Sequence, residues 1–473
     1  MSTYATGGVS CRLPFQHNTI ILTLLLAMGL TLRLLFIWLG ATIYYKDTSP
    51  YINGDTGSFT DSFLNLWQYG VYSFNQLNPD AAFGRLPGYP FFWGGHYLVF
   101  GERYTFPAVA FTQCLLDTVA IYLVYATARA LTRDIRAAWI SAFLYASYPF
   151  VIVWITVSGS ETLATFSAIT LFWWLATRRV TSRNALLAGL MVGVALMVRE
   201  YQGILLVPVV IWIYNSVRER KRFVRLSAFA LLGFVSLYIG WPIRNYVFQH
   251  RLMLLKPSTA GYDRYAEDVS SARTWIYGWN PDADIYLDGI AGKAALPEFP
   301  VDVFKSPVER SQAQQLFVRA RQCGTGFYNW RYNRRYEGKE NCNSDLAAGF
   351  TALNNSYRQR HPLLYWTYVP LLNLEKAFLK NRLLASNGNH FTSVLFGFRT
   401  LLLFLAIVGV IMLWHYSSTR PIVFFFVFMY LFICVGLRQL EMRYLLQADA
   451  TMLSFAGVPL ARLLNWKNRK RNQ

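Results

Sequence analysis

The chain has 473 residues, of which 54% are hydrophobic and 15% are charged, and its formal net charge is +20. So much apolar surface cannot be buried in the single core of a soluble protein of this length, which excludes an ordinary soluble domain. The sequence contains no G-x-x-x-x-G-K-[ST] phosphate loop and no G-x-G-x-x-G fingerprint, so no motif indicates binding of ATP or a dinucleotide.

The apolar residues form long runs along the chain. Almost every residue from 19 to 45 is apolar, and about 20 such residues suffice to cross a bilayer as a helix. This run is too long for a removed signal peptide and lacks a small-residue cleavage site, so we expect a retained span. The runs together predict an all-α polytopic membrane protein with about ten transmembrane helices, at 19–45, 105–127, 137–155, 162–177, 185–198, 203–215, 226–243, 395–414, 421–437 and 444–464.

The basic residues lie mainly in short segments between these runs, which argues against nucleic acid as a partner. The N-terminal stub, the loops at 128–138, 177–184, 216–225 and 415–420, and the tail from Arg462 contain only two acidic residues, Asp134 and Glu219. By the positive-inside rule these segments face the cytoplasm. The sequence therefore predicts that both termini are cytoplasmic.

Two predicted external segments, 46–104 and 248–394, are too long to be simple connections. Aromatic stretches at 63–67 and 91–93 predict short helices in the plane of the membrane interface. The second segment is polar, and we expect mixed structure there, ending in another interfacial helix over 361–385. The predicted parts are an N-terminal transmembrane module (1–247), an external region (248–394), and C-terminal helices with a basic tail (395–473).

Two of the five cysteines, Cys323 and Cys342, lie in the second external segment. An oxidising compartment favours a disulfide between such residues, whereas two free thiols in a loop are the alternative. We expect the disulfide.

Charged and polar residues gather near the predicted external ends of the spans, where such residues are candidates for function. The planar guanidinium group suits phosphate oxygens, and a nearby carboxylate can accept a proton from a hydroxyl. Each residue alone could be an ordinary charge at a helix end, and Arg438 and Glu441 are spaced to pair with each other. The set is Asp55, Asp61, Arg85, Glu161, Arg199, Glu200, Tyr201, Arg244, Asn245, Arg438, Glu441, Arg443 and Tyr444.

The order of these motifs resembles the GT-C glycosyltransferases of the protein O-mannosyltransferase and aminoarabinose-transferase type. An acidic motif follows the first span, and a basic residue precedes a proline-rich segment about 30 residues later. The matching segments, spread over about 19–464, are 54–59 (GDTGSF), 85–92 (RLPGYPFF), 158–161 (SGSE), 241–245 (WPIRN) and 443–444 (RY).

This resemblance implies a polyprenyl-phosphate sugar donor, inversion at the anomeric carbon and a bacterial inner-membrane enzyme with a periplasmic active site. It implies that Asp55 is the general base, Glu161 a second acid near the acceptor, and Arg85 a ligand of the donor phosphate. Arg199, Arg244 and Arg443 are further candidates for donating hydrogen bonds to that phosphate. The residues expected to support this site or to bind the acceptor are Asp61, Tyr89, Glu200, Tyr201 and Glu441.

Two departures from the family pattern are Thr56, where many members have Glu, and Gly84, where the aminoarabinose transferases have an acid. The second weakens any metal site, and the histidines are scattered, so we expect no metal and no cofactor.

Other functions are compatible with the same sequence. A transporter or flippase for a lipid-linked sugar would use Arg33, Asp117 and Asp449, which lie within spans, although such residues also pair inside bundles. An oligosaccharide polymerase or ligase also places arginines in external loops. Among acceptors, the absence of a large soluble domain and the Trp-, Tyr- and Arg-rich external loop favour lipopolysaccharide, another glycan or a lipid over a protein.

Overall fold

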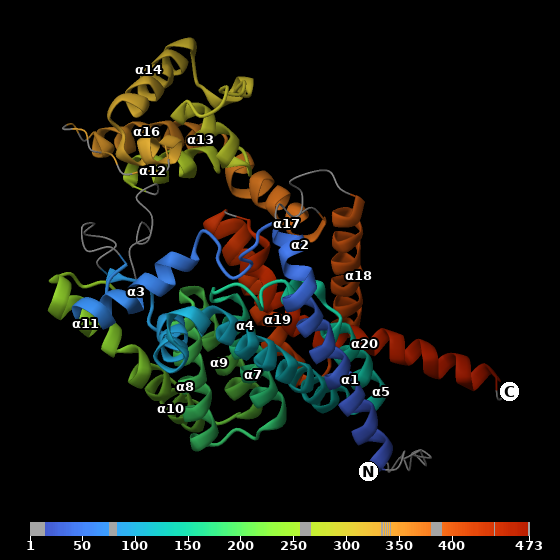
Figure 1. The fold of residues 1–473 in the computed structure, drawn as a ribbon. Coiled ribbons are helices and arrows are strands. Elements are labelled where there is room, and N and C mark those ends of the chain that lie inside the picture. Colours follow the sequence, from blue (N-terminus) through green and yellow to red (C-terminus); the bar gives the residue numbers. More distant parts are fainter. Residues whose placement is uncertain are drawn as a thin grey trace.

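The computed structural model describes residues 15–74, 83–255, 266–332, 334, 336, 338, 340, 342–379, 390–438 and 440–471. Long apolar helices form a bundle, and a smaller helical unit lies above one end of it (Figure 1). These ranges contain helices and irregular loops but no strand. The predicted all-α fold class is therefore confirmed.

All ten predicted spans overlap helices of the bundle. These are α1 (Phe15–Leu35), α2 (Ala41–Tyr45), α4 (Gly88–Thr132), α5 (Ile135–Ala146), α6 (Pro149–Ile152), α7 (Glu161–Thr177), α8 (Ser182–Val198), α9 (Leu206–Ser216), α10 (Arg220–Tyr238), α11 (Gly240–Gln249), α18 (His390–Leu413), α19 (Arg420–Leu431) and α20 (Met442–Arg471). Within the described ranges, five helical stretches are long and apolar enough to cross a membrane: Asn18–Tyr45, Gly88–Thr132, Arg220–Gln249, Val394–Leu413 and Ser417–Leu437. The chain is a multi-pass membrane protein, and the number of ten spans stays a prediction.

The first external segment contains helix α3 (Thr56–Tyr69) and the beginning of α4. Within α4, Gly101 has φ 68° and ψ 174°, which breaks the helical path. Glycine takes this conformation without the steric cost that a Cβ would add. The break separates the 88–100 stretch, which contains the aromatic segment 91–93 predicted as a short interfacial helix, from the apolar part that follows.

The second segment predicted to be external forms a helical unit with its own core, which we call the external unit after that prediction. The external unit consists of α12 (Glu267–Ile276), α13 (Ala283–Ala291), α14 (Pro307–Cys323), α15 (Thr325–Tyr332) and α16 (Asn343–Arg360). Trp275 is fully buried at its centre, and its ring centroid lies 5.8 Å from that of Phe299 and 6.0 Å from that of Phe350. We expected mixed structure here, and the described residues are helices joined by loops. Cys323 and Cys342 are joined by a disulfide with a Sγ–Sγ distance of 2.03 Å.

A π-helical turn (Leu364–Tyr368) and helix α17 (Val369–Leu379) lead from the external unit back to the bundle. One face is exposed and apolar, including Trp366 and Leu371, while Asn373 on the other face donates to the Cys434 carbonyl at 3.0 Å. This pattern agrees with the predicted interfacial helix, whose residues 380–385 lie outside the described ranges. Its orientation in the membrane stays a prediction.

Candidate active site

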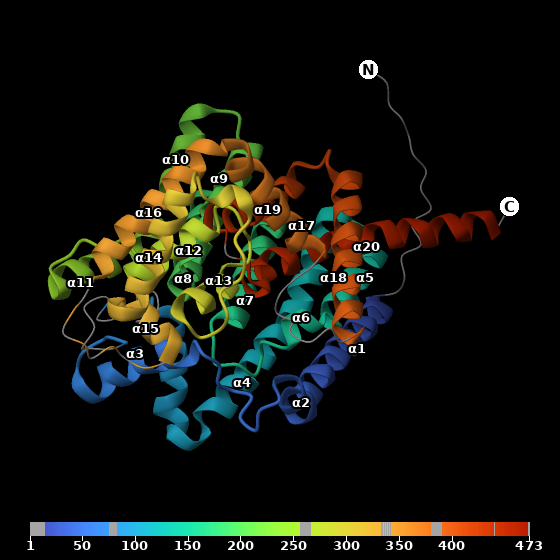
Figure 2. The same cartoon turned by 90° about the horizontal axis from the view of Figure 1, so that it is seen from above.

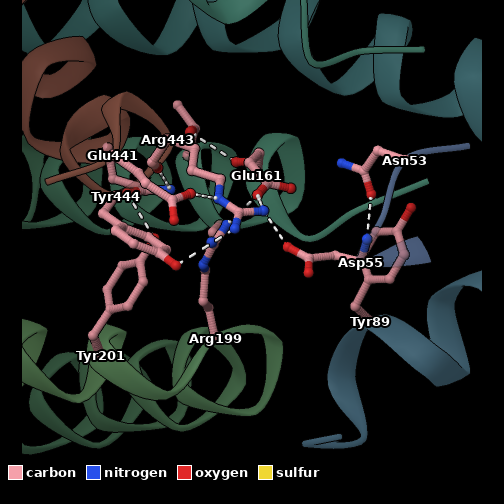
Figure 3. A network of polar contacts seen from close by, with 12 residues as sticks. Asn53, Asp55, Tyr89, Glu161, Arg199, Tyr201, Glu441, Arg443 and Tyr444 are labelled. Atoms are coloured by element: carbon pink, nitrogen blue, oxygen red, sulfur yellow. Dashed lines mark hydrogen bonds and ion pairs between the residues drawn. The ribbon is translucent and has the colours of Figure 1, made fainter. Parts of the chain in front are cut away.

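Charged side chains from distant parts of the chain meet at one end of the bundle (Figure 3). Asp55 immediately precedes α3, and Arg85 precedes α4. Glu161 is the first residue of α7, and Arg199 follows α8. Arg443 lies in the first turn of α20. We call these residues, with Glu441, the charge cluster.

The backbone around Asp55 is fixed by a short polar turn. The Asn53 side-chain oxygen accepts hydrogen bonds from the Asp55 backbone N–H at 2.9 Å and from the Thr56 backbone N–H at 3.1 Å. An asparagine that bonds to the backbone two residues further on forms an Asx turn. The turn begins α3 and places the Asp55 carboxylate in the cluster.

Arg443 connects three carboxylates (Figure 3). Its Nη1 forms an ion pair with Asp55 and lies 3.7 Å from Glu161 Oε1, and its Nε is 2.5 Å from Glu441 Oε2. The guanidinium also lies 5.2 Å from the centroid of the Tyr444 ring, within cation–π range. Because one cation is shared among three anions, no single carboxylate saturates it.

Glu161 and Arg199 form the buried side of the cluster. Arg199 Nη1 lies 2.8 Å from Glu161 Oε1, and their side chains are only 9% and 4% exposed. The Arg199 guanidinium also lies 5.1 Å from the ring centroid of Tyr201 and 5.3 Å from that of Tyr444. A buried ion pair is tolerated when the other polar groups of its two side chains have favourable contacts. Here the two rings help to hold the Arg199 guanidinium in place.

Arg85 approaches Asp55 from the other side. Its Nη2 lies 3.9 Å from Asp55 Oδ1, its Nε donates to Ser58 Oγ at 2.7 Å, and its guanidinium lies over the Phe59 ring. The Asp55 and Arg85 side chains are 22% and 15% exposed, so this side is the more open one. The cluster thus contains three guanidinium groups and three carboxylates, with Asp55 and Arg85 accessible to a ligand.

The other candidate residues lie outside the charge cluster or at its margin. Arg244 donates to the carbonyl oxygens of Phe83, at 3.0 Å, and Tyr72, which holds the two ends of the 72–83 connection together. Tyr89 donates to Gln113 Oε1 at 3.2 Å. Within the described ranges Arg244 makes no contact with the charge cluster, and its role at the phosphate stays a prediction.

The remaining candidates flank the cluster. Asp61 lies one turn into α3, where Thr60 Oγ1 donates to it at 3.2 Å and burial raises the pKa of its carboxyl group. Tyr201 donates to Gln447 Oε1 at 3.2 Å, and Glu200 opens the 3-10 turn that follows Arg199.

Sequence reasoning missed the neutral side chains that position the charges: Asn53, Ser58 and Gln447. Asn53 could have been found, because Asn-Gly-Asp at 53–55 is a typical turn sequence before a helix. Ser58 and Gln447 give no such signal, since short polar residues at helix positions are common. Within the described ranges, no three His, Cys, Asp or Glu side chains are grouped as metal ligands would be.

Comparison with known proteins was made for both sequence and structure. Residues 84–243 match the family model described as dolichyl-phosphate-mannose-protein mannosyltransferase. No curated protein matches the chain in sequence.

Among solved structures, the archaeal oligosaccharyltransferase AglB from Archaeoglobus fulgidus, in complex with an inhibitory peptide and a dolichol-phosphate, is similar with a TM-score of 0.51 and 13% identity. The match covers 97% of this chain and 52% of AglB, so the chain spans about half the length of that protein. The apo form of the same enzyme gives a TM-score of 0.50 and 10% identity over the same shares of the two chains. ArnT from Cupriavidus metallidurans bound to undecaprenyl phosphate gives 0.39 and 14%, over 94% of this chain and 78% of ArnT.

The family model and the likeness to the archaeal enzyme cover segments that carry the motifs found in the sequence. The family model covers residues 84–243, the segment that contains Arg85, Glu161 and Arg199. The structural likeness to the archaeal enzyme extends over nearly the whole chain. The chain therefore has the polytopic all-helical fold of the GT-C membrane glycosyltransferases.

Proposed function

We propose that this protein is an inverting glycosyltransferase that moves a single sugar from a polyprenyl-phosphate donor to an extracytoplasmic acceptor. The observation that carries the proposal is the contact of Asp55 with Arg443 and Arg85 at one mouth of a GT-C bundle. A general base and phosphate-binding cations are the two functions that this transfer requires. The family model and the dolichol-phosphate bound to AglB support a lipid-phosphate donor.

In the proposed reaction, the acceptor hydroxyl attacks the anomeric carbon while the bond from that carbon to the phosphate oxygen breaks. The hydroxyl proton passes to Asp55, and the lipid phosphate leaves as a dianion. Arg85, Arg199 and Arg443 stabilise the charge that builds on the phosphate oxygens, because fixed guanidinium groups need little reorganisation. A single displacement inverts the anomeric configuration.

The ion pair between Asp55 and Arg443 indicates the order in which the sugar donor and the acceptor bind. A carboxylate paired with a guanidinium is a poor proton acceptor, because the cation stabilises its ionised form. The donor phosphate competes with Asp55 for Arg443, while Arg199 keeps Glu161 in place. Donor binding thus frees Asp55 to act as a base, so the donor binds before the acceptor.

The proposed site lies on the outer side of a bacterial inner membrane, with both termini in the cytoplasm. Glu161 begins α7, and the basic residues Arg178 and Arg179 follow its end at Thr177. Helix α8 then returns to Arg199. Because 17 helical residues extend about 25 Å, this basic loop lies at the opposite end of the helix pair from the cluster. The positive-inside rule therefore supports an external site.

Transport has less support than transfer. Arg33 and Asp117, which a transporter would use within the membrane, form a buried ion pair at 2.6 Å, and Asp449 pairs with Arg399 at 2.8 Å. The acceptor we propose is lipopolysaccharide, another glycan or a lipid.

The test is to incubate purified protein with polyprenyl-phosphate sugars and lipopolysaccharide and to measure the free lipid phosphate that is released. Release from a monophosphate-linked single sugar supports the proposal, with Asp55→Asn as the inactive control. Activity that requires a pyrophosphate-linked glycan identifies a polymerase or ligase. Movement of the lipid-linked sugar across vesicles without cleavage identifies a flippase.

A further inference from the structure

Arg438 occupies an unusual position at the junction of three parts of the molecule. It follows the π-helical turn Phe432–Leu437 that ends the α19 segment, and its φ of 55° lies in the left-handed region. A residue with a Cβ adopts this conformation at a steric cost and keeps it where the surrounding contacts compensate. Its side chain is 94% buried, with a relative exposure of 6%.

The contacts of Arg438 join the external unit to the bundle. Its Nη1 donates to the Tyr277 carbonyl at 3.3 Å, at the C-terminal end of α12, and its Nη2 donates to the Tyr365 carbonyl at 2.8 Å. The guanidinium carbon lies 4.0 Å from the centroid of the Tyr365 ring and 5.4 Å from that of Trp366. A cation at a helix C-terminus also interacts favourably with the helix dipole.

The surroundings of Tyr365 show how closely this junction is packed. A Cβ added to Gly278, the residue after Tyr277, would lie 2.8 Å from Tyr365 Cε2 and 3.2 Å from Asn354 Oδ1 of α16. The end of α12 and the C-terminal half of α16 therefore meet the Tyr365 turn. The spacing of Arg438 and Glu441 suggested an ion pair between them, but Glu441 pairs with Arg443 instead.

Arg438 is also only three residues from Glu441 and five from Arg443, both members of the charge cluster. A short segment thus connects a residue that binds the external unit to Arg443, which binds Asp55. We propose that Arg438 is a positioning residue that fixes the external unit above the cluster, so that an acceptor held by this unit reaches the donor sugar. This inference rests on the proposed function and assigns the external unit a part in acceptor placement.

The test compares two arginines with similar contacts. Arg438→Gly removes the side chain but leaves a residue that favours a positive φ, so the backbone is not strained further. Arg438→Gln keeps a hydrogen-bonding side chain without the charge. The control is Arg360→Gln, because Arg360 also donates to two backbone carbonyls, those of Asp302 and Val303, but entirely within the external unit.

Three measurements separate positioning from general stability: the affinity for polyprenyl phosphate, the rate of lipid-phosphate release with lipopolysaccharide as acceptor, and amide hydrogen exchange. For Arg438→Gly we expect an affinity within about threefold of the wild type, a transfer rate at least about tenfold lower with a raised acceptor KM, and faster exchange at 276–279. For Arg360→Gln we expect faster exchange near 302–304 and transfer within about threefold of the wild type.

Wild-type transfer by well-folded Arg438→Gly protein overturns the inference. An equal loss of lipid-phosphate affinity and transfer also overturns it, because Arg438 would then act on the donor site. The same holds for an equal loss of transfer in Arg360→Gln, which would indicate general destabilisation. If the wild-type protein releases no lipid phosphate, the proposed function fails, and unchanged exchange at 276–279 in Arg438→Gly then excludes the positioning role separately.

Discussion

The bundle contains arginine–carboxylate sites of two kinds. In one kind, Arg33 binds Asp117, whose other oxygen accepts from Tyr145 at 2.5 Å. A second site of the same composition joins Arg399 of α18, Asp449 of α20 and Tyr430 of α19. In these buried triads each carboxylate has one guanidinium and one hydroxyl partner. The charge cluster has the same residue types but shares three guanidinium groups among three carboxylates.

The triads and the cluster differ in how accessible their charged groups are to a ligand. The arginine and aspartate side chains of the triads are at most 4% exposed, and each guanidinium also donates to a backbone carbonyl, that of Ala146 or Ala377. A buried ion pair is retained more easily when its groups also have hydrogen-bond partners of this kind. Asp55 and Glu441 are 22% and 29% exposed and share one cation. The two kinds of site therefore contain the same residue types and differ in the sharing and the exposure of their charges, which makes the cluster the candidate functional site.

The largest expected effect is on catalysis by Asp55→Asn. Asparagine is nearly isosteric with aspartate but accepts no proton at neutral pH, so we expect turnover to fall by about 10²–10⁴-fold. The fold and the binding of polyprenyl phosphate should persist. The measurement is single-turnover release of lipid phosphate, with thermal melting as the check on folding.

The control for this variant is Asp61→Asn. Asp61 lies in α3, the helix that Asp55 immediately precedes, but outside the charge cluster, so its substitution should leave most of the activity. Equal and mild effects of the two substitutions would mean that this segment needs acidic residues only for solubility. Near-wild-type turnover by folded Asp55→Asn protein would exclude Asp55 as the base, and Glu161 would be the next candidate.

For the buried triads we expect an effect on stability. Asp117→Leu leaves the Arg33 guanidinium without its counter-ion, which costs about 3–5 kcal/mol in comparable buried pairs. The double variant Arg33→Met, Asp117→Leu removes both charges and should recover most of this loss. Thermal melting in detergent compares the three proteins. A double variant that is less stable than Asp117→Leu would show that the triad is more than an internal ion pair.

The positions of the long apolar helices could be predicted because apolar runs reflect the membrane directly. The set of charged residues could be listed for a similar reason, since Asp55, Glu161 and Arg443 all lie at ends of such runs. Their partners could not, because Arg443 is 388 residues from Asp55 and the sequence contains no periodicity that relates them. The fold of the external unit was also missed, since its helices have polar surfaces and its core depends on a few aromatic residues around Trp275.

Removal of the disulfide should destabilise the external unit and leave the charge cluster intact. Replacing Cys323 and Cys342 by serine opens a loop of about 20 residues, and the chain-entropy estimate for such a loop is about 3 kcal/mol. We expect a lower melting temperature and faster amide exchange in α14–α16, with unchanged affinity for polyprenyl phosphate. Mass mapping without reductant should find the linked peptide in the wild type, and two alkylated thiols would contradict the pairing.

The smallest expected effect, and the one that examines the open side of the cluster, comes from Arg85. Its Nε already donates to Ser58, and its Nη2 lies 3.9 Å from Asp55, so one edge of the guanidinium is held in place while the other lies on the more exposed side. A hydrogen bond to a charged group contributes about 1.5–3 kcal/mol, so Arg85→Ala should weaken binding of a polyprenyl-phosphate analogue by roughly 10–100-fold. Arg85→Lys keeps the positive charge but loses the planar fork, so its affinity for the analogue should lie between those of the wild type and Arg85→Ala.

Arg244→Lys is the matched control, because Arg244 donates to the Tyr72 and Phe83 carbonyls rather than to the cluster. Wild-type affinity in both Arg85 variants would remove this residue from the phosphate site and leave Arg199 and Arg443, the two cations that pair with Glu161, to bind the donor.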